Sequence, residues 1–191
     1  MCDDHAMKRA GGRARLLGLA ALWLWAVPAF AQDESPAIQR YLGNLRLGDT
    51  LEDVQRVYPP AQEWPALAAP RGGVTRIKVE RENAKKFPPD VDILWLGFRK
   101  GHLVEIQLIY DARFSRKRSS EVLAERMSLV YGDPNRSSDK FWWSDGSTVL
   151  RVFGAELPTR KDEAPQKDEA QSLELRTSIQ IMERGLFRRL E

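Results

Sequence analysis

Two apolar segments separated by a two-residue turn constrain the fold of this chain more than any other feature of its sequence. The segments run from Val91 to Arg99 and from His102 to Tyr110, with Lys100-Gly101 between them. Turns of this kind close antiparallel hairpins, because glycine readily adopts the positive φ that their geometry requires. We therefore predict a β-hairpin over these segments and, around it, an antiparallel sheet.

The first predicted strand is apolar on both faces, which is unusual for a sheet with solvent on one side. Alternation places three side chains on each face: Val91, Ile93 and Trp95 on one, and Leu94, Leu96 and Phe98 on the other. In the second strand Val104, Ile106, Leu108 and Tyr110 share a face. Either the rest of the chain covers the second face of the sheet, or a partner, a second copy or a ligand does so.

Capping residues and turn signals place a helix before each of two sets of strands. In the first half, Thr50 starts a helix that Pro59-Pro60 ends, and strands follow within 74–82, 91–99 and 102–110. Ser35-Pro36 and Gly43 frame a further short helix.

In the second half, Ser119-Ser120 starts a helix whose Leu123, Met127, Val130 and Tyr131 share a face, and Gly132 ends it. Strands follow at 141–143 and 148–153 around Asp145-Gly146, and again at 172–182. The last strand alternates, with Leu173, Leu175, Ile179 and Ile181 inward and Glu174, Arg176 and Gln180 outward.

These patterns predict an α+β fold of tandem α-β-β-β units, with an antiparallel sheet and helices on one face. The first unit covers residues 32–112 and the second covers 113–191, and the two are separate domains or one fused domain. Residues 154–171 contain Lys-Asp-Glu-Ala twice, which is typical of a solvated, mobile loop within the second unit.

Residues 1–31 have the three parts of a secretory signal peptide. Four basic residues precede an uncharged stretch from Leu16 to Phe30, and Ala29-Phe30-Ala31 resembles a cleavage site. The stretch is shorter than the roughly 20 apolar residues of a membrane-spanning helix. We therefore expect an exported protein, periplasmic or secreted, with no integral membrane span after cleavage.

Cleavage changes the charge balance and the cysteine content. Residues 1–31 hold four of the 30 basic and two of the 27 acidic residues, so 26 basic and 25 acidic residues remain and the net charge is +1. This balance gives no reason to expect binding to nucleic acid. The only cysteine, Cys2, lies within the removed segment, so we expect no disulfide, thiol chemistry or lipid attachment.

Two short stretches carry a family resemblance. Leu47-Gly48-Asp49-Thr50-Leu51-Glu52-Asp53-Val54 and Tyr131-Gly132-Asp133-Pro134, with the strands that follow the latter, resemble the BamE-like group of small envelope proteins and the related β-lactamase-inhibitor-protein fold. The resemblance implies a non-catalytic role in protein binding or scaffolding in the bacterial cell envelope. No lipidated cysteine stands at the signal junction, and the motif is divided between two halves, which favours the tandem inhibitor-like arrangement.

Few residues are suited to catalysis or to metal binding. After cleavage His102 is the only histidine, and we expect an ordinary exposed or half-buried role for it. One histidine without cysteine provides few ligands for zinc, haem or an iron–sulfur cluster, so we predict no cofactor and no metal. We expect the protein not to be an enzyme.

Aromatic and basic side chains mark the surface that we expect to bind a partner. The candidates are Trp95, Tyr110, Arg113, Arg116, Lys117, Arg118 and Trp143. Tryptophan and tyrosine are enriched at interface hot spots, and the basic run fits lipid phosphates, an acidic partner or simple solvation. We therefore expect an exported protein that binds an envelope or extracellular protein, or forms a homodimer. The alternative is a small-ligand or lipid carrier in the periplasm.

Overall fold

The computed structural model describes residues 36–64, 73–158 and 173–187. The predicted signal peptide and residues 159–171 of the predicted loop lie outside these ranges. All the elements below belong to one compact unit, which comprises residues 34–191.

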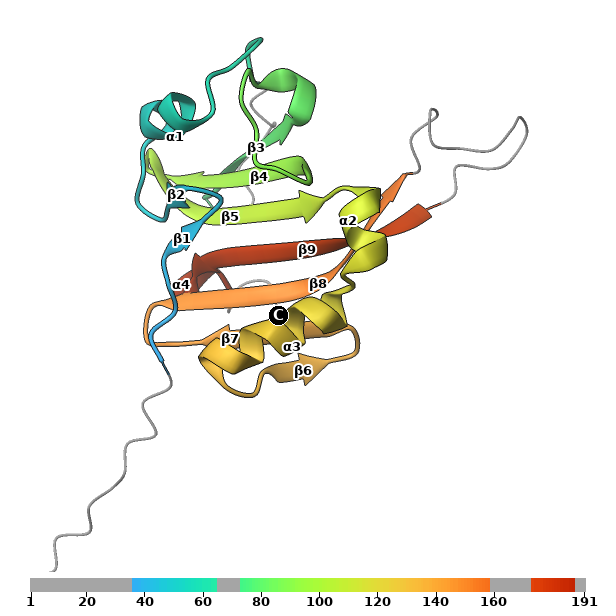
Figure 1. The fold of residues 1–191 in the computed structure, drawn as a ribbon. Helices are drawn as coiled ribbons and strands as arrows, with labels where there is room; N and C mark the ends of the chain where they lie inside the picture. The colour runs from blue at the N-terminus through green and yellow to red at the C-terminus, as the bar shows by residue number, and fades with distance from the viewer. Residues whose placement is uncertain (1–35, 65–72, 159–172, 188–191) are drawn as a thin grey trace, which may run out of the picture. The chain divides into compact units, whose positions relative to one another are not determined.

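Seven of the strands form one sheet, in which every neighbouring pair is antiparallel (Figure 1). Its strands, in spatial order, are β3 (Thr75–Glu80), β4 (Val91–Arg99), β5 (His102–Tyr110), β9 (Leu173–Glu183), β8 (Thr148–Pro158), β7 (Lys140–Ser144) and β6 (Asn135–Ser137). The protein is therefore α+β, and strands from both predicted units contribute to the same sheet.

The remaining elements are short. They are a small hairpin of β1 (Tyr41–Leu42) and β2 (Leu45–Arg46), the helices α1 (Leu51–Val57), α2 (Ala112–Lys117), α3 (Ser120–Tyr131) and α4 (Arg184–Phe187), and the 3₁₀ turn η1 (Arg81–Asn83). In the described part of the chain, none of the helices combines the length and the apolar character needed to cross a membrane.

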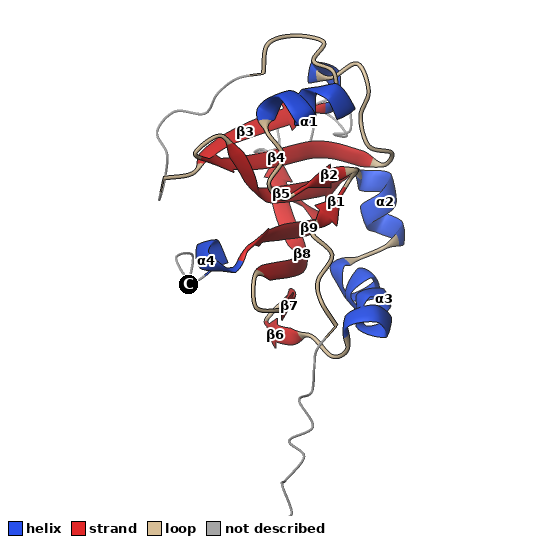
Figure 2. Ribbon diagram, turned by 90° about the vertical axis from the view of Figure 1, so that its left-hand side faces the viewer, coloured by secondary structure: helices blue, strands red, loops and turns tan. Residues whose placement is uncertain are grey.

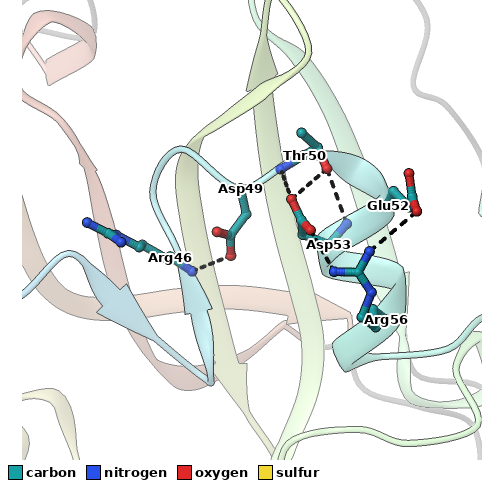
Figure 3. Close-up of polar contacts among 6 residues, drawn as sticks. All are labelled: Arg46, Asp49, Thr50, Glu52, Asp53 and Arg56. Carbon is teal, nitrogen blue, oxygen red and sulfur yellow. Dashed lines mark hydrogen bonds and ion pairs between the residues drawn. The ribbon is translucent and has the colours of Figure 1, made fainter.

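The start of α1 is fixed by a reciprocal capping box, as the sequence predicts (Figure 3). The Asp53 N–H donates to the Thr50 hydroxyl at 3.2 Å, and the Thr50 N–H donates to the Asp53 carboxylate at 3.1 Å. The Arg46 N–H donates to Asp49 and fixes the turn that leads into the helix. The stretch that carries the family resemblance is therefore a helix start with a structural role.

The β4–β5 hairpin is confirmed, and two β-bulges modify its faces. Lys100 and Gly101 have φ of 51° and 81°, the positive values that a tight hairpin turn requires. Register shifts lie between Val91 and Ile93 and between Gly97 and Phe98. A shift of one residue turns a side chain to the opposite face. The prediction from strict alternation therefore placed Val91 and Val104 on the wrong faces. Val91 packs with Leu94 in the main core, and Val104 lies on the second face.

Two hydrophobic cores lie on opposite faces of the sheet. The larger one, which we call the main core, includes Val54 of α1 and Leu123 of α3. The second face carries a smaller cluster in which Leu186 of α4 packs with Val149 and Met182. Figure 2 accordingly shows α2 and α3 on one side of the sheet and α4 on the other. The prediction that helices occupy one face is not confirmed, because α4 packs on the second face.

The inward and outward pattern predicted for β9 was wrong along much of the strand. Leu173 and Leu175 are 63% and 58% exposed, because β9 extends with β8 beyond the strands beside it. Arg176 and Gln180, expected outside, are buried with polar partners. Residues 154–158, assigned to the mobile loop, instead continue strand β8.

Three further local predictions were wrong. Residues 36–43 form no helix, and residues 41–46 form the β1–β2 hairpin around Gly43 and Asn44, both with positive φ. The basic run 113–118, interpreted from the sequence as a solvated loop, lies largely in the helix α2. Val130 does not share the buried face of α3, because it is 59% exposed.

Candidate functional site

Helix α2 gathers the basic residues that the sequence singled out. Asp111 caps the helix, since the Phe114 N–H donates to its carboxylate at 2.7 Å. Residues three and four positions apart lie on the same side of a helix. Arg113 and Lys117 therefore lie on one side together with Phe114, while Ala112 is buried beneath them.

A pocket of about 290 Å³ opens on this side of α2. Its lining combines three cations, one aromatic ring and one carboxylate: Arg113, Lys117, Arg118, Phe114 and Asp90. The three cations are exposed to solvent. Among the described residues, none of them forms an ion pair with a carboxylate. The pocket can therefore accept an acidic group without first breaking an internal salt bridge.

Phe114, the one aromatic ring in the lining, lies in a stack with Tyr110 and the Arg118 guanidinium group. The rings of Tyr110 and Phe114 lie parallel with centroids 3.9 Å apart, and the Arg118 guanidinium carbon lies 5.1 Å from the centre of the Phe114 ring. This distance suits a cation–π contact, which holds the arginine over the ring.

The phenol of Tyr110 is perturbed by the same surroundings. Burial raises its pKa, the nearby Asp90 carboxylate raises the pKa further, and Arg118 acts in the opposite direction. Tyr110 therefore stays neutral at physiological pH, so the charge around the pocket comes from the cations and Asp90.

Asp90 is held by the backbone at the edge of the pocket. Its φ is 57°, a left-handed conformation that aspartate tolerates better than most residues, and its carbonyl accepts a hydrogen bond from the Asp111 N–H at 2.8 Å. This contact joins the start of β4 to the cap of α2. The sequence does not place Asp90 beside α2, since nothing local shows this proximity.

Arg116 lies apart from the pocket. Its guanidinium is 3.8 Å from Glu174 of β9, which also pairs with Arg176 at 2.9 Å. Arg176 is buried and pairs with Asp92 of β4 at 3.1 Å. This chain of charges connects α2 to β9 and β4, and it gives Arg116 an acidic partner that the three pocket cations lack within ranges 36–64, 73–158 and 173–187.

The two tryptophan candidates do not line the α2 pocket. Trp143 is 4% exposed in the main core, where its ring packs near Tyr131 and its indole N–H donates to the Gly132 carbonyl at 2.7 Å. Buried in this way, it offers almost no surface to a partner. Trp95 is half-buried on the second face, between Lys78 and Gln107 on the neighbouring strands.

Of the predicted site residues, the structure thus brings together Tyr110, Arg113, Lys117 and Arg118. It adds Asp90 and Phe114, and it separates Arg116, Trp95 and Trp143 from them. His102 is exposed, and its ring Nδ1 lies 3.1 Å from the Gly48 carbonyl oxygen.

Comparison with known proteins assigns no family to the chain. No family model matches it, no curated protein matches it, and no solved structure matches it. The resemblance to the BamE-like group stays a hypothesis that rests on the two short stretches named above.

Proposed function

We propose that this chain is an exported, non-enzymatic protein of the bacterial cell envelope that binds another protein through the α2 pocket. One observation carries the proposal: three cations that form no ion pair within the described residues surround Phe114, which stacks on Tyr110. The group that fits this pocket is an aspartate or glutamate side chain, or a chain-terminal carboxylate, of an acidic segment in the partner.

Arginine is well suited to this role. Its planar guanidinium binds a carboxylate through two parallel hydrogen bonds, and such pairs are stronger than neutral hydrogen bonds. The stack on Phe114 restrains Arg118 before binding, so less side-chain entropy is lost when a ligand arrives. Asp90 at the edge repels a second carboxylate, which favours one acidic group in a defined orientation.

We also propose that the fold consists of two α-β-β-β units. The sheet order supports this, because β3-β4-β5 and β7-β8-β9 occur in opposite spatial order and meet where β5 pairs with β9. A capped helix precedes each set, α1 in the first half and α3 in the second, and both helices contribute to the main core. In the second half the short strand β6 lies between α3 and β7.

The alternative, a small-ligand or lipid carrier, has one observation in its favour. A second hollow of about 420 Å³ lies beside α1, and its lining includes Leu51, Pro60, Trp64 and Ile77. A carrier with this site would retain a small apolar molecule during purification from its own cells. Native mass spectrometry of the purified protein would detect that molecule.

The test of the main proposal is capture of the partner from intact cells after crosslinking, followed by mass spectrometry. The Arg113→Glu/Lys117→Glu variant reverses two charges of the pocket and should lose the partner. The matched control is Arg126→Glu, which reverses an exposed cation on α3 and should retain it. Equal capture by all three proteins, or no partner above background with the wild type, would reject the proposal.

A further inference from the structure

Six side chains from six neighbouring strands form one transverse row across the second face of the sheet. Each is the direct cross-strand neighbour of the next: Lys78, Trp95, Gln107, Gln180, Arg151 and Trp142. The two tryptophans stand four strands apart, which is about 19 Å at the usual ~4.8 Å spacing between strands. We call these six residues the polar–aromatic row.

Hydrogen bonds hold the centre of the row in place. The Gln107 amide N–H donates to the Ser178 hydroxyl at 2.9 Å, and the Gln180 amide N–H donates to Glu105 at 2.6 Å. Arg151 donates to the Gln180 carbonyl oxygen at 3.4 Å. Glu105 and Ser178 are themselves buried, so the orientation of these amides is set before any ligand binds.

The row lies between two covered parts of the same face. On one side, Leu186 of α4 packs over Val149 and Met182. On the other, Ile93 and Ile109 are buried. All the members of the row except Gln180 are half-buried, so each presents part of its side chain to the surface.

Two cations of this face have carboxylate partners. Arg76 pairs with Glu105 at 2.9 Å, and Lys78 pairs with Glu80. Ligands rich in phosphate bind where cations are in clear excess, which is not the case here. The row also differs from a typical protein interface, whose centre is apolar and whose rim is polar. Here amides and a guanidinium group occupy the centre, and the aromatic rings lie toward the ends.

We infer that the polar–aromatic row is a second binding site, and that its ligand is a neutral glycan lying across the strands. The half-buried ring of Trp95 suits the apolar C–H face of a pyranose, as aromatic side chains combine a large apolar surface with defined geometry. Trp142 packs against Phe187 of α4, with ring centroids 6.1 Å apart, and closes the other end of the row. The Gln107 amide beside Trp95 suits the hydroxyls of the sugar, while Arg151 is held over the rings of Phe153 and Phe187. This site is independent of the α2 pocket.

Binding of neutral oligosaccharides to the protein, purified after expression of the full chain, tests this inference. The probes are chitohexaose, cellohexaose and maltohexaose, and isothermal titration calorimetry gives the affinity. At least one probe should bind in the millimolar range or tighter. Trp95→Ala and Gln107→Ala should each weaken that affinity by about tenfold, the effect of losing roughly 1.4 kcal/mol of contact.

The control for this experiment is Arg126→Glu, which should bind the oligosaccharide with unchanged affinity because Arg126 is exposed on α3, which packs on the opposite face of the sheet. Circular dichroism establishes that each variant is folded. No binding of any probe, or equal binding by wild type and the folded Trp95→Ala protein, would overturn the inference. Capture of a protein through Trp95, without glycan binding, would overturn it as well. None of these results depends on whether the α2 pocket binds a protein.

Discussion

The rings of Tyr110 and Phe114 lie nearly parallel, with centroids 3.9 Å apart and planes inclined by 13°. Tyr110 ends β5 and Phe114 lies in the first turns of α2, so the stack fixes the helix against the end of the strand. It also positions Arg118, whose guanidinium group lies over the Phe114 ring. The geometry of the candidate pocket therefore depends on this pair.

Phe114→Ala should weaken both the pocket and the fold. It removes the stack on Tyr110 and the surface beneath Arg118, and loss of a half-buried aromatic pair should lower the free energy of unfolding by about 1–2 kcal/mol. Urea denaturation measures this change. Phe114→Tyr, which keeps the ring, is the control, and equal stability of the Ala variant and the wild type would contradict the expectation.

Gly97→Ala should destabilise the sheet, because the second face has no room for a side chain there. A β-carbon at position 97 would lie 2.8 Å from Cβ of Glu105 and 2.9 Å from its carboxylate. The Arg76–Glu105 pair spans this glycine, so an added methyl group should cost about 1–3 kcal/mol through overpacking.

The matched control for this substitution is Gly146→Ala, where a β-carbon would meet no atom within 4 Å. Thermal unfolding of both variants gives the comparison. If Gly97→Ala unfolds at the same temperature as Gly146→Ala, the close approach of Glu105 lacks the destabilising effect that the structure implies.

Asp145→Asn should remove part of the stability that the wild type has at neutral pH. Desolvation alone would raise the pKa of Asp145, but N–H groups of Ser147, Ile38 and Thr148 donate to the carboxylate and together lower the pKa below 3.8. An amide has one accepting oxygen where the carboxylate has two. The free energy of unfolding of the variant should therefore fall by about 1 kcal/mol, a value reduced by partial exposure to solvent.

The sign of the pH dependence follows from the lowered pKa. In the wild type this contribution is present above pH 3.8 and is lost as the pH falls through the folded-state pKa. The difference in unfolding free energy between wild type and Asp145→Asn should therefore shrink in that acidic range, as denaturant titrations at several pH values would show. A difference that stays constant down to pH 2 would be inconsistent with this origin.

Thr50→Ala should destabilise α1 by about 0.5–2 kcal/mol, the usual cost of losing a helix cap. The substitution leaves the Asp53 N–H without the hydroxyl that accepts its hydrogen bond. Thr50→Ser retains a hydroxyl and should restore most of the loss in urea denaturation, whereas similar losses for Ala and Ser would point to the methyl group instead.

Local signals in the sequence predicted the elements whose ends are fixed by neighbouring residues. Thr50 and Ser119 cap helices as expected, Gly132 ends α3, and Lys100-Gly101 forms the tight turn of the central hairpin. Each of these depends on hydrogen bonds or φ values within a few residues, which are visible in a single sequence.

Helix α2 and the β1–β2 hairpin had signals that were not used. Asp111 is a good capping residue, but residues 112–117 lack apolar periodicity, so the stretch resembles a loop. Gly43-Asn44 between Tyr41-Leu42 and Leu45-Arg46 is a recognised hairpin signal, yet Pro36 favoured a helix. In both cases the prediction missed a capping or turn residue that was itself a correct signal.

The burial of Arg176 and Gln180 could not be predicted from the sequence. Their partners Asp92 and Glu105 lie 84 and 75 residues away, and only the pairing of β9 beside β5 brings them together. The same holds for the pocket, since Asp90 meets α2 through the tertiary fold. Trp143 was misjudged because adjacent residues of a strand face opposite ways, and only the fold shows which of Trp142 and Trp143 faces the main core.

Site-specific photo-crosslinking in cells tests the central proposal most directly. A photoreactive residue replaces Lys117 in the pocket or, as the control, the exposed Arg126 on α3. The proposal predicts that position 117 crosslinks one envelope protein through an acidic segment and that position 126 does not. Crosslinks from position 126 alone, or none from either position above background, would contradict it.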